Sequence, residues 1–168
     1  FNIFNKDIEI SLEANPSSYE TKKFVDLKKL GINRLSIGVQ SLNNKNLHFL
    51  GRLHNVNDVY NAVDHATKNF DNVSADLMYA FYRQDLNLWI DELENFLQRY
   101  DFKHISLYQL TIEKGTKFFT DFKKGLIQLI DNDLAADFYT RTNMILSEYH
   151  FNRYEISNYS KLNFECKH

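Results

Sequence analysis

Apolar residues recur along this chain with two alternating periods, one typical of β-strands and the other of amphipathic α-helices. Alternating apolar and polar residues, with many β-branched side chains, predict strands at residues 7–14, 34–40, 72–79, 104–110 and 154–159. Between them, apolar residues spaced three and four apart predict helices at about 19–30, 57–69, 85–100 and 132–149. Strands and helices therefore alternate along the whole chain.

Residues that favour helix ends lie where these patterns change. Asn43 or Asn44 is suited to cap a further short helix that ends near Leu50, and Gly31 lies where a left-handed helix cap is expected. The stretch 113–129 follows neither period. It is the best candidate for a mobile loop.

The alternation of strands with helices of this length indicates the fold class. Such βαβ units are right-handed and place parallel strands side by side beneath their helices. A closed barrel of these units usually takes about 250 residues, whereas this chain has 168. We therefore expect a single α/β domain over 1–168, a partial parallel (β/α) barrel that is open where amino-terminal units are missing.

Both ends of the sequence look unlike natural domain borders. The first residue is Phe1 rather than methionine, and the closing segment NFECKH contains neither a helix stop nor a strand turn. We therefore expect the sequence to be a fragment of a longer protein.

The composition indicates which classes of molecule the protein binds. The net charge of -2 gives no electrostatic footprint for nucleic acid or anionic membrane. No apolar run approaches the ~20 residues of a membrane span, and the opening residues lack the apolar stretch of a secretory signal. We expect a cytoplasmic protein without a transmembrane segment, with small-molecule or protein partners. The single cysteine, Cys166, leaves no thiolate cluster for zinc or iron–sulfur within the chain.

Polar residues end the predicted strands. Ligands of parallel α/β folds bind at the carboxyl ends of the strands, where this chain has Glu13, Gln40, Asp76 and Gln109. These side chains are suited either to line one ligand site or to cap neighbouring helices and loops. Arg52, just after a helix, has a similar pair of interpretations, a clamp for carboxylate or phosphate or an ordinary surface charge.

Five separated blocks resemble one known family. The segments resemble LEANP, RLSIGVQS, LGRxH, DLxYGLPGQ and LSLYxLxxExxT of the radical S-adenosylmethionine (SAM) family that includes oxygen-independent coproporphyrinogen III oxidase and its haem-chaperone relatives. The matching blocks here are EISLEANP (9–16), NRLSIGVQSLN (33–43), LGRLH (50–54), ADLMY (75–79) and HISLYQLTIEKGT (104–116). The resemblance covers nearly the whole chain. The sequences of two further segments, DNDLAADFY (131–139) and YEISNYS (154–160), resemble the chaperone branch in particular.

The resemblance implies that SAM lies across the strand ends. By its motifs, Glu13 matches a residue that contacts the cofactor, and Gln40 and Arg52 match residues that engage its amino-acid or ribose portion. Asp76 matches a ligand of the ribose region, whereas Gln109 has weaker support. The residue types suit the chemistry, since a guanidinium pairs with the methionyl carboxylate and carboxylates accept from an ammonium or from ribose hydroxyls.

The radical reaction of that family needs a four-iron–four-sulfur (4Fe–4S) cluster held by a CxxxCxxC loop. This sequence contains no such loop and only one cysteine. We therefore expect no radical catalysis from this chain alone and assign it no catalytic residue or metal ligand. Whether the complete protein is an enzyme stays open.

A second departure lies after the third strand. Where the family reads YGLPGQT, residues 79–85 read YAFYRQD, so both glycines and the proline are replaced. Glycine in such a loop usually allows a positive φ or a close approach, so these replacements should strain or reshape the loop. Functional divergence and genetic decay would both explain them.

The resemblance also suggests haem as a ligand. Cys166-Lys167-His168 looks like the beginning of a CRHNxxYW-like segment of the chaperone branch, which makes His168 a candidate haem ligand. The alternative is that a terminal histidine has no ligand at all. Three functions remain open: a haem chaperone that delivers haem to acceptor proteins, part of a coproporphyrinogen III dehydrogenase in porphyrin biosynthesis, and a nonfunctional remnant.

Overall fold

The computed structural model describes residues 8–17 and 21–167. Its strands are β1 Ser11–Ala14, β2 Arg34–Gln40, β3 Asn72–Tyr79, β4 His104–Gln109, β5 Asn152–Arg153 and β6 Asn158–Ser160. Its helices are α2 Phe24–Lys29, α3 Asn44–Phe49, α4 Val56–Asn69, α5 Leu86–Arg99, α6 Lys117–Lys123 and α7 Asn132–Glu148.

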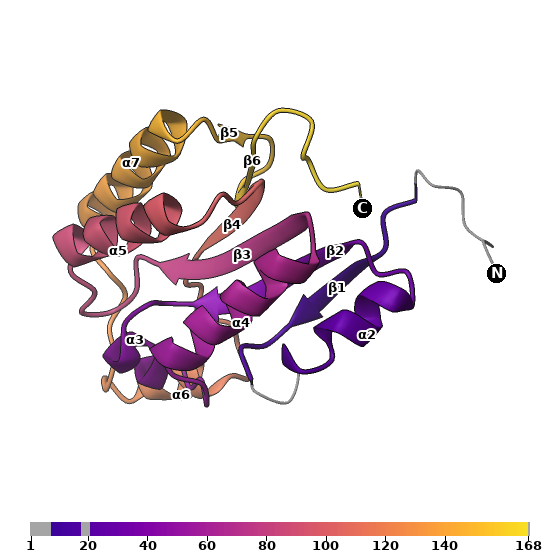
Figure 1. Ribbon diagram of the computed structural model, residues 1–168. Coiled ribbons are helices and arrows are strands. Elements are labelled where there is room, and N and C mark those ends of the chain that lie inside the picture. The colour runs from indigo at the N-terminus through magenta and orange to yellow at the C-terminus, as the bar shows by residue number, and fades with distance from the viewer. Residues whose placement is uncertain (1–7, 18–20, 168) are drawn as a thin grey trace.

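One sheet joins all six strands in the order β1-β2-β3-β4-β6-β5. The first four are parallel, and each is reached from the one before by a crossover containing helix (Figure 1). The predicted α/β fold with a partial parallel barrel sheet is confirmed by this topology.

The two faces of the sheet differ because side chains alternate along each strand. One face is apolar, lies beneath α4, α5 and α7, and carries residues that are buried to at least 96%: Leu35, Ile37, Val39, Val73, Ala75, Leu77, Tyr79, Ile105 and Leu107. The opposite face carries polar residues. The hydrophobic core therefore lies between the sheet and its helices.

Except for α2, the described helices begin at side chains that satisfy their free N–H groups. Asn43 caps α3, Asp85 caps α5, and Asn55 and Asp58 form a reciprocal capping box at the start of α4. Trp89 of α5 then stacks on Tyr79 of β3, with ring centroids 5.5 Å apart. These contacts fix where each helix starts and how it lies on the sheet.

The fifth strand expected at 154–159 is wrong in extent and direction. Residues between β5 and β6 form a turn, in which the Asn158 side chain donates to the Glu155 carboxylate at 2.7 Å. Ile156, which the alternating pattern would bury, is 87% exposed. Because the chain reverses in this turn, β6 joins β4 antiparallel rather than as another parallel strand.

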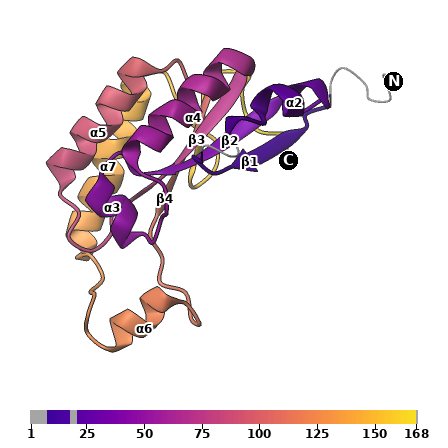
Figure 2. The same cartoon turned by 60° about the horizontal axis from the view of Figure 1, so that its bottom comes forward.

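The stretch 113–129 is not a loop throughout, because it contains α6. The Thr116 hydroxyl accepts the Phe119 N–H at 3.2 Å and so caps the helix. Phe118 packs on Phe49 of α3 with ring centroids 5.3 Å apart. Figure 2 shows α6 standing off from the other helices at the end of two connecting segments.

The loop after β3 keeps a backbone suited to glycine although both glycines of the family pattern are replaced. Ala80 has φ 57° and Arg83 has φ 61°, both in the left-handed region. This conformation costs a non-glycine residue about 1–2 kcal/mol. The replacements are therefore accompanied by backbone strain in this loop.

Arg83→Gly should raise the free energy of unfolding by about 1 kcal/mol, because glycine adopts a positive φ without a steric penalty. Arg83 is exposed and its guanidinium lies over the Tyr82 ring, 4.9 Å from the ring centroid, so little packing is lost. Chemical denaturation of Arg83→Gly beside Arg83→Ala measures the effect, since both remove the same side chain. Equal stability of the two variants would contradict a left-handed Arg83.

Candidate functional site

Polar side chains occupy the sheet face that the helices leave uncovered. They recur at every second residue of the parallel strands and lie in register on neighbouring strands: Glu13, Arg34, Ser36, Ser74, Asp76, His104 and Ser106. In a barrel this face is the interior. Seven polar groups on one face favour a site rather than a purely structural sheet.

Asp76 lies at the centre of this polar face. Its carboxylate accepts the Ser36 hydroxyl at 3.0 and 2.9 Å, and the Ser106 hydroxyl from the other neighbouring strand also bonds to it. Burial raises the pKa of Asp76 and the nearby charge of Glu13 adds to the rise, while the two hydroxyls and Arg34 oppose it. The fold therefore holds a carboxylate where its charged form is disfavoured.

Asp76→Asn should stabilise the protein at pH 7. The raised pKa means that folded Asp76 contributes most to stability below its usual pKa of 3.8 and that this contribution is lost as pH rises through the raised value. Asparagine keeps an acceptor for Ser36 without the charge. Denaturant titrations of parent and variant should show a gain at pH 7 that vanishes toward pH 4, with the exposed Asp91→Asn as the matched substitution. A loss of stability at pH 7 would contradict the effect of burial.

A second buried cluster lies at the amino-terminal ends of the strands. The Ser74 hydroxyl donates to His104 Nδ1 at 2.7 Å, and Arg34 Nη2 lies 3.3 Å from the same nitrogen. Since a guanidinium only donates, Nδ1 is the acceptor and Nε2 carries the proton. His104 Nε2 therefore donates to the Tyr154 hydroxyl at 2.7 Å.

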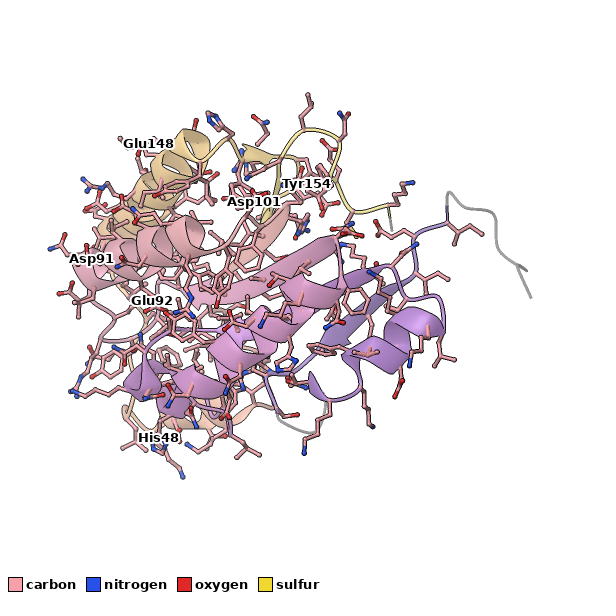
Figure 3. The ribbon with its side chains drawn as sticks, viewed as in Figure 1. His48, Asp91, Glu92, Asp101, Glu148 and Tyr154 are labelled. Atoms are coloured by element: carbon pink, nitrogen blue, oxygen red, sulfur yellow. The ribbon has the colours of Figure 1, made fainter. Side chains whose placement is uncertain are left out.

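The carboxyl-terminal segment crosses this end of the polar face. Tyr154 lies beside the first residues of β4 (Figure 3). Its oxygen also accepts the Cys166 N–H at 3.2 Å, and the Cys166 thiol lies 3.2 Å from Glu9 Oε1. The segment thus connects β4 with the chain entering β1.

Asp76 and Glu13 line the same small cavity. Its volume is about 70 Å³, and its walls combine the Asp76 group with the His104 cluster: Glu13, Arg34, Ser36, Asp76, His104, Ser106, Tyr108, Tyr154, Glu155, Asn158 and Cys166. The structure therefore brings together two of the residues singled out in the sequence.

Gln40 ends β2 in an unusual conformation. Its φ is 66°, and the β2–β3 register shifts between Ile37 and Gln40. A Cβ atom at Gly38 would lie 3.1 Å from Gln40 Nε2 and 3.7 Å from the Ala14 carbonyl oxygen. The Gln40 side chain therefore lies over Gly38, which has no side chain to block it, beside the carboxyl end of β1.

Arg52 lies in the loop between α3 and α4. Its Nε is buried and has no hydrogen-bond partner within 8–17 and 21–167. His54 links this loop to β2, since its Nε2 lies 3.3 Å from the Val39 carbonyl oxygen. Burial lowers the pKa of His54, and the Arg52 charge lowers it further. A carboxylate ligand would satisfy the unpaired Arg52 nitrogen.

Gln109 lies apart from these residues. It pairs in register with Tyr79, whose side chain points to the helix face, so Gln109 projects away from Asp76. It is exposed and lines a separate cavity of about 110 Å³ with Phe49, Phe81 and other residues of the β3 and α6 loops. Gln109 is thus not placed with Glu13 and Asp76.

Three further expectations concern haem, metal ions and the membrane. His168, the candidate haem ligand, lies outside the described residues. Among the residues that are described, no three His, Cys, Asp or Glu side chains are grouped for a metal ion, and no helix is long and apolar enough to span a bilayer.

Sequence reasoning missed Arg34, His104 and Tyr154. For Arg34 and His104 the available signal was the polar residue at every second position inside strands, since 34 and 36, like 104 and 106, project to one face. Attention to strand ends alone finds Asp76 but overlooks the groups that surround it.

Comparisons with known proteins find relatives of the radical SAM superfamily. A model of the radical SAM superfamily matches residues 2–107. The chain is 40% identical over 166 residues to "Heme chaperone HemW" of Buchnera aphidicola subsp. Acyrthosiphon pisum (strain APS), which aligns 99% of this chain with 43% of that protein. It is 38% identical over 156 residues to "Radical S-adenosyl methionine domain-containing protein 1, mitochondrial" of Bos taurus, covering 92% of this chain and 35% of that one.

Among solved structures, coproporphyrinogen III oxidase (HemN) from Escherichia coli is similar with a TM-score of 0.80. The alignment covers 95% of this chain and 37% of that one, and at 22% identity it shows the shared fold alone. The chain spans less than half the length of each of these proteins.

Proposed function

Because this chain belongs to the radical SAM superfamily, in its branch of haem chaperones and coproporphyrinogen III oxidase-like proteins, we propose that it is the SAM-binding part of a haem chaperone. The observation that carries the proposal is the 40% sequence identity with a haem chaperone, in an alignment that covers 99% of this chain. The cofactors of this superfamily are SAM and a 4Fe–4S cluster. The chaperone activity, the haem and the acceptor proteins belong to the proposal.

The proposed SAM site combines Glu13, Gln40, Arg52 and Asp76. Arg52 binds the methionyl carboxylate through its buried, unpaired Nε. Glu13 accepts from the ammonium, while Gln40 and Asp76 bind ribose hydroxyls. The raised pKa of Asp76 supports this assignment, since side chains that cost stability are often kept for a ligand.

The cluster does not fit this chain by itself. When bound in the superfamily, it supplies the electron that splits SAM, but three thiolates hold it and this sequence has one cysteine. The proposal for this chain is therefore binding rather than catalysis.

The haem part of the proposal rests on the carboxyl-terminal residues. Cys166 offers a thiol and His168 an imidazole, the two side-chain types that most often bind haem iron. The proposal includes the cytoplasmic location expected from the sequence, which cell fractionation would test.

Haem titration tests this part. Adding haem to the full chain should shift its Soret absorption to a saturable end point, and His168→Ala should remove most of the shift, whereas the exposed His65→Ala should not. Absence of any spectral change with the parent chain would overturn the haem role.

A further inference from the structure

A buried carboxylate of α5 holds the turn that follows β2. Glu92 Oε1 accepts the Ser41 hydroxyl at 2.8 Å and also the backbone N–H of Leu42. Figure 3 shows Glu92 directed from α5 toward the interior, whereas its neighbour Asp91 lies at the periphery. Residues 50 and 51 positions apart in the sequence are thus joined directly behind Gln40.

The turn held by Glu92 is the one that forces Gln40 into the left-handed region. The Ser41 N–H donates to the Val39 carbonyl oxygen at 2.9 Å, which reverses the chain across Gln40 at φ 66°. The Ser41 hydroxyl also accepts the Asn43 N–H at 3.1 Å and so joins the turn to the cap of α3. A non-glycine residue keeps such a conformation only where its surroundings impose it.

A contribution to folding stability does not explain why Glu92 is a carboxylate. Burial raises the pKa of Glu92, and only the bonds from Leu42 and Ser41 offset that rise. A carboxylate buried without a paired cation is costly even when it is hydrogen-bonded. Its bonds are made to the one turn that directs Gln40.

The left-handed backbone of Gln40 determines where its side-chain amide lies. With this backbone, its side-chain nitrogen lies over Gly38, where a Cβ atom would lie 3.1 Å from it and 3.7 Å from both the Ala14 carbonyl oxygen and Asn15 Oδ1. An ordinary extended Gln40 would instead continue the strand alternation. The left-handed turn is therefore what places this amide beside the carboxyl end of β1.

We propose that Glu92 is a positioning residue, which fixes the turn after β2 so that Gln40 presents its amide to SAM. This inference rests on the proposed function of Gln40. Glu92 itself does not touch the cofactor.

Amide hydrogen exchange tests the turn without any ligand. Glu92→Ala should speed exchange at the Leu42 N–H by at least tenfold and leave the β2 amides unchanged, because it removes the acceptor of that N–H alone. Asp91→Ala, at the neighbouring exposed position of α5, should change neither. Unchanged protection at Leu42 in Glu92→Ala would overturn the proposed clamp.

SAM affinity, measured by calorimetry, tests the consequence. Glu92→Ala and Gln40→Ala should each weaken binding about tenfold, the effect of losing one charge-assisted or well-placed hydrogen bond. The double variant should be no weaker than the weaker single variant, since both changes remove the same contact. Glu92→Gln, whose amide oxygen still accepts both bonds, should restore most of the affinity.

Each outcome separates the inference from the function on which it rests. If Gln40→Ala binds SAM like the parent, the proposed contact of Gln40 is wrong, and the inference falls with it. If Gln40→Ala weakens binding but Glu92→Ala does not, or if the two losses add, the inference alone is overturned. Should Glu92→Ala fail to fold, Ser41→Ala removes one of the two bonds and should weaken binding about threefold; parent-like affinity of that variant counts against the clamp.

Discussion

Trp89→Ala should lower the free energy of unfolding by about 4 kcal/mol, the largest loss that we expect from a single replacement in the core. Trp89 is 1% exposed, stacks on Tyr79 of β3, and donates its indole N–H to the Thr142 hydroxyl of α7 at 2.8 Å. It thus joins the sheet to two helices, and alanine would leave a cavity at their junction. Chemical denaturation monitored by far-ultraviolet circular dichroism measures the loss.

Trp89→Phe is the matched control. It keeps an aromatic ring against Tyr79 but loses the bond to Thr142, so we expect a loss of only about 1–2 kcal/mol. A loss below about 1.5 kcal/mol for Trp89→Ala itself would contradict the packing of α5 and α7 on β3. Glu92 lies one helical turn from Trp89 on α5. The packing of Trp89 therefore also determines the position of the Glu92 carboxylate.

His104→Ala should lower the free energy of unfolding by about 3 kcal/mol. His104 is 1% exposed, and its removal leaves the buried Arg34 guanidinium and the Ser74 hydroxyl without their shared acceptor. It also removes the donor to Tyr154, so the segment 154–166 should become more sensitive to proteolysis. Denaturation and limited proteolysis of the same sample measure both effects.

His65→Ala provides the comparison, since His65 is exposed on α4 and its replacement should change stability by less than about 0.5 kcal/mol. A loss below about 1 kcal/mol in His104→Ala, with unchanged proteolysis, would mean that the buried cluster does not hold the carboxyl-terminal segment.

Helices α3, α4, α5 and α7 could be predicted closely from the sequence because local signals determine them, whereas α2 begins at Phe24 rather than near residue 19. The apolar stripe of α5 and its cap Asp85 are both readable from residue types and spacing, and Asn43 was one of two residues expected to cap α3. The parallel sheet followed from the alternation of strands and helices. These features depend on neighbours in sequence.

The segment after α7 could not be predicted, because its pairing depends on a distant partner. Residues 154–159 alternate like a strand, yet Tyr154 leaves that pattern to bond with His104, and the bond between Asn158 and Glu155 closes a turn. Nothing within the segment reveals His104. The same is true of α6, whose packing partner Phe49 lies in α3.

The candidate site was predicted in part, and strand geometry explains the rest. Side chains on adjacent positions of a strand point to opposite faces, so residues that merely end their strands need not face one another. Asp76 pairs with Ser106, and Gln109 lies three residues further on, which turns it to the helix face. The strain at Gln40, Ala80 and Arg83 lies at strand ends as well, but only the last two were suggested by the sequence.

We expect these strand ends to bind SAM although this chain lacks the cysteines for the cluster. Calorimetric titration of the folded chain with SAM tests it most directly, with Arg52→Ala and the exposed Arg141→Ala as a matched pair. Binding should be saturable at one site. Arg52→Ala should weaken it about 10- to 100-fold, because it removes a charge-assisted contact to the carboxylate, and Arg141→Ala should leave it unchanged. No saturable binding by the folded chain, or equal affinity of both variants and the parent, would contradict it.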